Sequence, residues 1–191
     1  RQEYLSEIIS ESNRMVSFAN DILEYSTSDN ISLFISKISF DDFIEDLSKT
    51  LQNHFEKFNI SVIVKNEFHE LISFDIERMR RVIINIATNA KNALINKGSN
   101  DSTFTIESKF DTESNQLIIN CIDNGPGVHE SIQATLFEPF VTYGAHNGSG
   151  LGMAIVKKIV ETHSGSIQLH TKINEGTTFS ISIPVINEET I

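Results

Sequence analysis

The feature that most constrains this chain is the stretch from Asp123 to Gly152, in which two glycine clusters bracket a long segment with little regular pattern. The first cluster, DNGPG, directly follows an apolar run, and the second, GSGLG, leads directly into a segment with helical spacing. Long connections without secondary structure of their own are uncommon in compact domains and are usually functional. We therefore expect the two clusters to frame a binding site.

Bulk properties indicate a folded, acidic chain. Its 191 residues can form one full domain and a smaller attachment, and a hydrophobic content of 39% with 13 Phe can supply a core. A formal net charge of -11 argues against direct binding to nucleic acid or to an anionic membrane surface. If the ligand is a polyanion, a divalent metal and backbone amides must supply the positive field.

The sequence also limits the expected surroundings of the chain. Cys121 is the single cysteine, so no internal disulfide can form, and a reducing compartment is expected. No apolar run approaches the roughly 18 residues that span a bilayer. The chain begins at Arg1 without a signal peptide pattern, and we expect it to be the C-terminal part of a longer protein, with any membrane segment outside it.

Residues 5–26 show the heptad spacing of a bundle helix, with apolar and small residues at alternating steps of three and four. Such a helix cannot bury its stripe alone, which predicts a helical bundle formed by self-association. The alternative is that the stripe packs against the chain's own domain. Because STSDN breaks the pattern, we divide the chain into a bundle helix (1–30) and a second domain (31–191). The stripe consists of Leu5, Ile8, Ser12, Met15, Ala19, Ile22 and Ser26.

The second domain mixes helical and strand patterns. Several neighbouring strands are joined by turns too short for a parallel crossover, which predicts an α+β fold: a two-layer sandwich with a mixed, mostly antiparallel sheet and helices on one face. Asp41 or Asp42 is expected to cap the first helix of this domain. We expect helices at about 41–55, 75–95 and 152–163, and strands at about 37–40, 60–64, 104–110, 117–123, 167–169 and 179–183.

Three asparagines, Asn85, Asn89 and Asn92, are spaced four and three residues apart, which places them on one face of the second of these helices. Each asparagine costs about 0.5 kcal/mol in a helix relative to alanine, so packing does not explain such a row. Amide groups can bind a hard cation and hydrogen-bond phosphates without adding negative charge. The alternative is a solvated helix face.

Asp123 ends an apolar strand, and strand alternation places it on the same covered side as Ile119 and Cys121. A carboxylate there is unfavourable unless it accepts a hydrogen bond, and a purine exocyclic amine is one suitable donor. Gly125 and Gly127 allow the backbone to approach a flat ligand closely. The alternative is that Asp-Asn-Gly simply ends a hairpin.

The third cluster runs from Gly148 to Gly152 into a helix. Unpaired amides of a glycine-rich loop at a helix N-terminus form an anion site, which the helix dipole favours. The cluster does not match the P-loop, because no Lys-Ser/Thr pair follows it. The alternative is a flexible loop without a ligand.

In this order, the three clusters resemble the catalytic ATP-binding domain of sensor histidine kinases. RMRRVIINIATNAKNAL is similar to the N box of that family, DNGPGV to its first glycine box, FEPF to its F box, GSGLGMAIVKKIVETHSG to its second glycine box, and EGTTFSISIP to its closing strand. The similarity covers about residues 37–186. The N-terminal helix, with E-x-x-R-M at residues 11–15, resembles the second helix of the family's dimerisation bundle.

The resemblance implies ATP and Mg2+ as ligands and assigns roles to individual residues. Asn89 would bind the Mg2+ that bridges the phosphates, with Asn85 and Asn92 beside it and Asn85 in an orienting role. Asp123 would accept a hydrogen bond from the adenine amine, and Thr177 would support it through water. The other residues of the implied nucleotide site are Gly125, Gly127, Phe140, Tyr143, Gly148, Ser149, Gly150, Leu151 and Gly152.

The implied reaction transfers the γ-phosphoryl group of ATP to a histidine and then to an aspartate of a response regulator receiver domain. It would take place in a homodimer held together by the N-terminal bundle, in the bacterial cytoplasm. The acceptor histidine of the family lies on the first bundle helix, whereas this chain begins in the second, so we expect ATP binding without an acceptor in this chain. Its histidines all lie in the second domain: His54, His69, His129, His146, His163 and His170.

Two departures from the family keep alternative functions open. No Lys or Arg occurs between Lys109 and Lys157, and Asn92 stands where many relatives have Lys, so a catalytically weak regulatory module is one alternative. The second alternative is a clamp-type ATPase such as gyrase, which shares the fold. Such ATPases carry a glutamate general base four residues before the Mg2+ asparagine, where this chain has Asn85, and an amide cannot take a proton from water.

Overall fold

The computed structural model describes residues 32–142 and 149–185 and, in the N-terminal segment, residues 4, 9, 11, 12, 15, 16, 18, 19, 22 and 23. These N-terminal residues are helical, as the heptad spacing predicts. Within the described part of the chain, no helix is long and apolar enough to cross a membrane.

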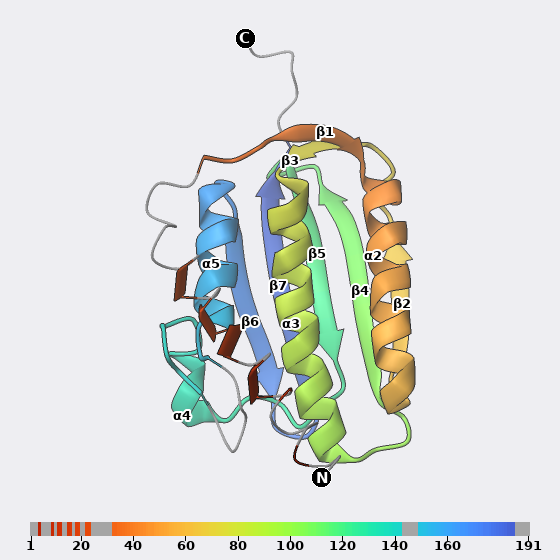
Figure 1. Cartoon of the computed structure of the whole chain (residues 1–191). Helices are drawn as coiled ribbons and strands as arrows, with labels where there is room; N and C mark the ends of the chain where they lie inside the picture. The colour runs from red at the N-terminus through yellow and green to blue at the C-terminus, as the bar shows by residue number, and fades with distance from the viewer. Residues whose placement is uncertain are drawn as a thin grey trace.

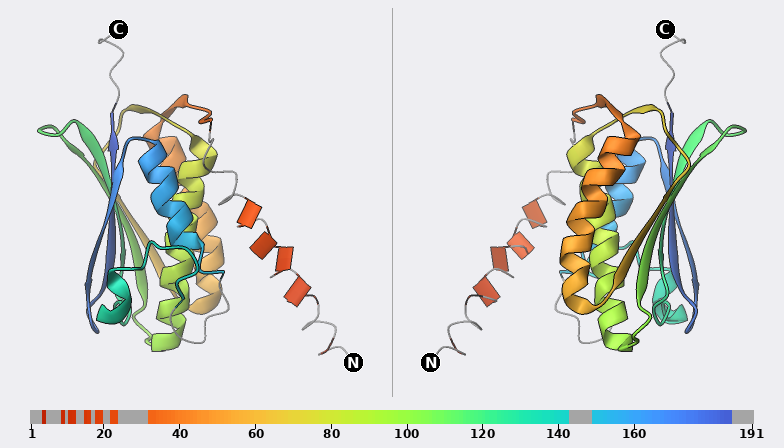
Figure 2. Two further views of the ribbon diagram at one scale, coloured as in Figure 1. Left: turned by 90° about the vertical axis from the view of Figure 1, so that its left-hand side faces the viewer. Right: turned by 90° about the vertical axis from the view of Figure 1, so that its right-hand side faces the viewer.

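A five-stranded sheet and three long helices form the two layers of the main fold. The strands are β2 (Ser61–Asn66), β4 (Thr103–Asp111), β5 (Gln116–Asp123), β6 (Ser166–Lys172) and β7 (Gly176–Pro184), and the helices are α2 (Phe40–Phe55), α3 (Ile76–Lys97) and α5 (Gly152–Thr162). The order in the sheet is β2-β4-β5-β7-β6. Only β2 and β4 pair in parallel, because α3 crosses between them, and the other pairs are antiparallel. The three helices lie side by side (Figure 1) and cover the same face of the sheet (Figure 2), so the expected sandwich is confirmed.

Four short elements complete the fold, and three of them are not expected from the sequence. The strand β1 (Ser36–Ser39) is expected; it pairs antiparallel with β3 (Leu71–Phe74), which is not. The other two are the 3-10 helix η2 (Glu56–Phe58) and the one-turn helix α4 (Glu130–Gln133), which lies within the long connection between β5 and α5.

The prediction that Asp41 or Asp42 caps α2 is wrong. The N-cap is Ser39, whose hydroxyl oxygen accepts a hydrogen bond from the Asp42 backbone N–H at 3.3 Å. Serine at this position satisfies an unpaired amide of the first turn. The two aspartates lie inside that turn, where their charges favour the positive end of the helix dipole.

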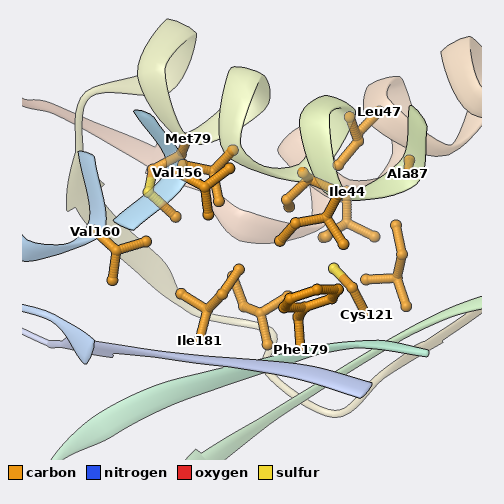
Figure 3. Packing of buried hydrophobic residues seen from close by; sticks show 14 of the residues in the cluster. Ile44, Leu47, Met79, Ala87, Cys121, Val156, Val160, Phe179 and Ile181 are labelled. Carbon is orange, nitrogen blue, oxygen red and sulfur yellow. The ribbon is translucent and has the colours of Figure 1, made fainter. Parts of the chain in front are cut away.

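The core lies between the three helices and the covered face of the sheet. Figure 3 shows Met79 of α3 and Val156 of α5 facing Phe179 and Ile181 of β7, with Cys121 of β5 beside them. Burial raises the pKa of the Cys121 thiol to about 12, so this residue is an unreactive part of the core. In β5 every second side chain is buried, up to and including Asp123 at 6% exposure, as strand alternation predicts.

Candidate functional site

The three clusters meet at one end of the sandwich. The C-terminal ends of α3 and β5 lie at the same end as α4 and the start of α5 (Figure 1). The Asn85 side-chain amide of α3 donates to the Gly152 carbonyl oxygen of α5 at 3.5 Å. A Cβ atom at Gly125 would lie 3.7 Å from that of Ala93, so α3 also adjoins the turn after β5. The helix that carries the asparagine face therefore joins both glycine clusters.

The buried carboxylate of Asp123 is held by the turn that follows it. Its Oδ1 accepts a hydrogen bond from the Gly125 backbone N–H at 2.8 Å. Burial raises its pKa from 3.8 to about 6, whereas the backbone N–H groups of Gly125 and Thr177 and the charge of Lys97 favour the ionised form and lower it. A carboxylate that titrates near neutrality and lies at a strand end is typical of a binding site.

Asp-Asn-Gly is not the connecting turn of a hairpin, although Asp123 is the last residue of the β4–β5 pair. The hairpin partner of β5 is the preceding strand β4, and the chain leaves the sheet after Asp123 towards α4. Gly125 is required by close approach, because a Cβ there would lie 2.6 Å from Asp123 Oδ1. Gly127 packs against the backbone carbonyl of Lys172 at the end of β6.

Two residues of the neighbouring hairpin, which the sequence pattern did not single out, hold this turn in place. The Thr171 hydroxyl accepts a hydrogen bond from the Val128 N–H at 2.9 Å. The same hydroxyl can donate to the Gly176 carbonyl oxygen at 3.0 Å, and it lies 3.3 Å from the Thr177 hydroxyl. Gly176 has φ of +115°, and a Cβ there would lie 2.0 Å from the Asp123 carbonyl oxygen. Both residues could have been found only from the pairing of the strands. In that pairing, Thr177 of β7 lies between Asp123 of β5 and Thr171 of β6.

The asparagine face of α3 is partly open to solvent. Asn85 is half-buried, and Asn89 and Asn92 are exposed. The neighbouring Lys91 has its ammonium group over the Phe58 ring, 5.2 Å from the ring centre. Amide oxygens are therefore the metal ligands that this face offers.

The second glycine cluster enters α5 through a tight turn. The Ser149 hydroxyl oxygen accepts a hydrogen bond from the Leu151 N–H at 3.2 Å, and the Leu151 side chain is fully buried, so this residue anchors the turn in the core. At Gly150, a Cβ would lie 2.7 Å from the backbone carbon of Phe140. At Gly152, no atom of the described residues that pack around this turn lies within 4 Å of the Cβ position.

Two phenylalanines in the connection before this turn have different surroundings. Phe137 packs edge-on against Phe179 of the core, with ring centres 6.3 Å apart. Phe140 has φ of +65° and is 64% exposed. Tyr143 and Gly148, also expected at the nucleotide site, lie outside the described residues.

The fold and this site define the class of protein. A family model described as histidine kinase-, DNA gyrase B-, and HSP90-like ATPase matches residues 74–187. Because the match covers more than half of the chain, the chain belongs to this family.

A curated relative indicates which members of this family the chain resembles. The chain is 31% identical over 182 residues to the autoinducer 2 sensor kinase/phosphatase LuxQ of Vibrio vulnificus (strain YJ016), an alignment of 90% of this chain and 21% of LuxQ. It therefore spans about a fifth of the length of this curated relative. The resemblance to the catalytic ATP-binding domain of sensor histidine kinases is confirmed.

Two solved structures share the fold. Full-length ShkA in complex with AMPPNP superposes with a TM-score of 0.84 at 19% identity, over 98% of this chain and 39% of ShkA. Histidine kinase ThkA in complex with the response regulator TrrA gives a TM-score of 0.76 at 24% identity, over 98% of this chain and 52% of ThkA.

Proposed function

We propose that this chain is the catalytic ATP-binding part of a two-component sensor histidine kinase. It would pass the γ-phosphoryl group of ATP to a histidine outside this chain, and from there to an aspartate of a response regulator. The observation that carries the proposal is that Asp123, the asparagine face of α3 and the helix entry at Gly152 converge at one end of the sheet. Phosphoryl transfer is mostly positioning and charge neutralisation, which such a site can supply.

The proposed role of Asp123 is to bind the base of the nucleotide. Its ionised carboxylate would accept a hydrogen bond from the adenine amine, and Thr177 is buried beside it, directly opposite in the strand register. The backbone of residues 125–127 would form one wall of the base pocket. The helix entry at Ser149–Gly152 would face the phosphates, where backbone N–H groups and the helix dipole favour negative charge.

The residues present fit a Mg2+ ion that arrives with ATP. The described residues contain no group of three His, Cys, Asp or Glu side chains that could hold a metal by themselves. Mg2+ needs only one or two protein oxygens when phosphates supply the others. Asn89 would provide the protein ligand, with Asn85 and Asn92 beside it, and the metal would neutralise phosphate charge that no lysine or arginine of the 110–156 segment can meet.

The proposed partners follow from the same assignment. The response regulator is suggested by the complex of ThkA with TrrA. The N-terminal helix (1–30) would form a homodimeric bundle, and of its described residues Met15 and Val16 are 66% and 61% exposed. The chain would act in the cytoplasm, with membrane attachment only through segments outside it.

Two other functions remain as alternatives. A clamp-type ATPase needs a general base, but Asn85 is an amide and uses its N–H to bond the Gly152 carbonyl. A regulatory module that binds nucleotide without efficient transfer is favoured by the absence of a lysine or arginine in the connection before α5.

The test is a labelling assay on a protein that carries the upstream histidine. With Mg2+ and γ-labelled ATP, we expect phosphoprotein that is labile in acid and stable in base, and Asp123→Asn should abolish it. Asp42→Asn, an exposed change in the first turn of α2, serves as the matched control and should label normally. Label recovered only as free phosphate would support the ATPase instead, and nucleotide binding without any transfer would support the regulatory module.

A further inference from the structure

The turn that carries Asp123 is braced by the end of α3 and by the connection that follows this helix. The Lys97 Nζ donates to the carbonyl oxygen of Asn124 at 2.5 Å. The Asn124 side chain accepts a hydrogen bond from the Thr103 N–H at 2.9 Å and donates to the Asp101 carbonyl at 2.6 Å. The residue directly after the carboxylate is thus fixed on both sides, by its main chain and by its side chain.

We propose that Lys97 is a positioning residue of the nucleotide site, which holds the Asp123 turn against α3 and keeps the carboxylate ready to accept a hydrogen bond from the base. The inference rests on the proposed function, because it names what prepares the base-binding group of that site. Ala93 adjoins Gly125, and Lys97 follows four residues later on the same face of the helix. The lysine therefore extends along the turn from the helix end.

Electrostatics supports this role. The charge of Lys97 lowers the pKa of Asp123 and so opposes burial, which raises it. Among the described charged residues near the turn, Lys172 pairs with Glu175, and Asp101 accepts a hydrogen bond from the Asn124 side chain with its backbone carbonyl oxygen. Removing the cation would favour the protonated carboxyl, which is a poorer hydrogen-bond acceptor.

The size of the effect follows from the exposure of Lys97. Its side chain lies at the surface, so solvent screens the interaction, and exposed charge pairs contribute about 0.2–1 kcal/mol. This corresponds to about a 1.5- to fivefold change in affinity. The fold-change should be largest below pH 6, where Asp123 is mostly protonated, and should become smaller above pH 8, where the carboxylate is ionised with or without the lysine.

The experiment measures the affinity of the 191-residue chain for MgATP and for adenosine between pH 5.5 and 8.5 by calorimetry. Lys97→Met should bind both about 1.5- to fivefold more weakly at the acid end of this range, near pH 5.5, and move the midpoint of the pH profile upward. Lys97→Arg keeps a charged donor and should restore the wild-type profile. Lys91→Met is the matched control, because Lys91 lies on the same helix but over the Phe58 ring.

The possible outcomes separate this inference from the proposed function. If the wild type binds MgATP and Lys97→Met binds it equally well with the same midpoint, the inference is overturned and the proposed function stands. If the wild type binds no nucleotide, the proposed function fails and the inference fails with it. A loss of affinity that is equal at all pH values, that arginine does not restore and that accompanies a lower melting temperature without nucleotide would indicate a structural role only, and would also overturn the inference.

Discussion

At the scale of the residue, Asp123 opposes stability and favours binding. Its folded pKa of about 6 exceeds the ordinary value of 3.8, so the folded chain holds this proton more tightly than the unfolded chain. The stability that the protonated carboxyl contributes is fully present below about pH 4 and is lost as the pH rises through about 6. Near neutrality, the folded chain therefore carries an ionised, buried carboxylate at a cost of about 3 kcal/mol relative to the protonated form.

Asp123→Asn should therefore stabilise the nucleotide-free chain and abolish nucleotide binding. At pH 7.5 we expect the melting temperature to rise by about 6–12 °C, because the amide carries no buried charge. Differential scanning calorimetry with and without MgATP measures both effects. Asp42→Asn should bind MgATP like the wild type and melt no higher, because it loses a favourable interaction with the dipole of α2. A variant that melts like the wild type and still gains stability from MgATP would contradict this role of Asp123.

The same pKa predicts how nucleotide affinity depends on pH. The ionised carboxylate is the stronger acceptor for the adenine amine, so affinity should fall as the pH falls through about 6. Adenosine isolates this effect, because it has no phosphate group that titrates. Calorimetric titrations with adenosine from pH 5 to 8 test the prediction, and an affinity that is constant over this range would refute it.

Gly176→Ala should disrupt the site from the neighbouring strand. The new Cβ would lie 2.0 Å from the Asp123 carbonyl oxygen, and φ is +115°, so we expect a loss of at least about 2 kcal/mol in unfolding free energy and weaker MgATP binding. Gly98→Ala is the matched control, because Gly98 has φ of +64° but nothing within 4 Å of its Cβ position. It should lose only about 1 kcal/mol, in urea unfolding, and keep its affinity. Equal losses in the two variants would mean that the contact with Asp123 has no influence.

At the scale of the element, both ends of α5 are joined to α3. Near the site, the join is the hydrogen bond from Asn85 to Gly152. At the opposite end, the Asp75 N–H donates to the Nε2 of His163 at 3.1 Å, and the other ring nitrogen, Nδ1, lies 2.8 Å from the Ile159 carbonyl. His163 is thus a residue of low exposure that connects the start of α3 to the end of α5.

Asp75→Asn should loosen the segment before β1 as well as α3. The Asp75 carboxylate accepts from the Arg78 N–H at 3.1 Å, as the N-cap of α3, and from the Phe34 N–H at 3.0 Å. A single amide oxygen binds two donors less well than the two oxygens of a carboxylate. We therefore expect the free energy of unfolding to fall by about 1–2 kcal/mol, and hydrogen exchange in residues 34–39 to become faster. Ser39→Ala removes the cap of α2 and should destabilise by about 1 kcal/mol without faster exchange at Phe34. Unchanged exchange in Asp75→Asn would contradict the tether.

Elements with a clear period could be predicted from the sequence, and those that depend on partners could not. The alternation of β5 placed Asp123 on the covered face, and the spacing of α3 placed the three asparagines together. β3 is only four residues long, so it shows no distinct period and is formed by pairing with β1. Thr171 and Lys97 were missed for the same reason, because each acts through a segment that is distant in sequence.

At the scale of the whole molecule, the proposed dimer interface lies on the N-terminal helix, whereas the nucleotide site lies in the second domain. A change in the interface should therefore leave the nucleotide site intact. Met15→Glu combined with Ile22→Glu places charges on the heptad stripe, so we expect dissociation of the full-length dimer in analytical ultracentrifugation. Nucleotide affinity should stay within about twofold of wild type. Reduced affinity with an intact dimer would contradict the division into a bundle helix and a nucleotide domain.

The connection between β5 and α5 has a further consequence for how this fold can vary. Its ends are fixed, by the Asp123 turn and by the buried Leu151, whatever lies between them. Loop-closure entropy grows only logarithmically, so doubling such a connection costs about 0.6 kcal/mol. Insertions, deletions and changes of charge between α4 and Ser149 should therefore alter which nucleotides and partners are accepted long before they prevent folding, and a chain without lysine or arginine in this connection can keep the framework of its relatives.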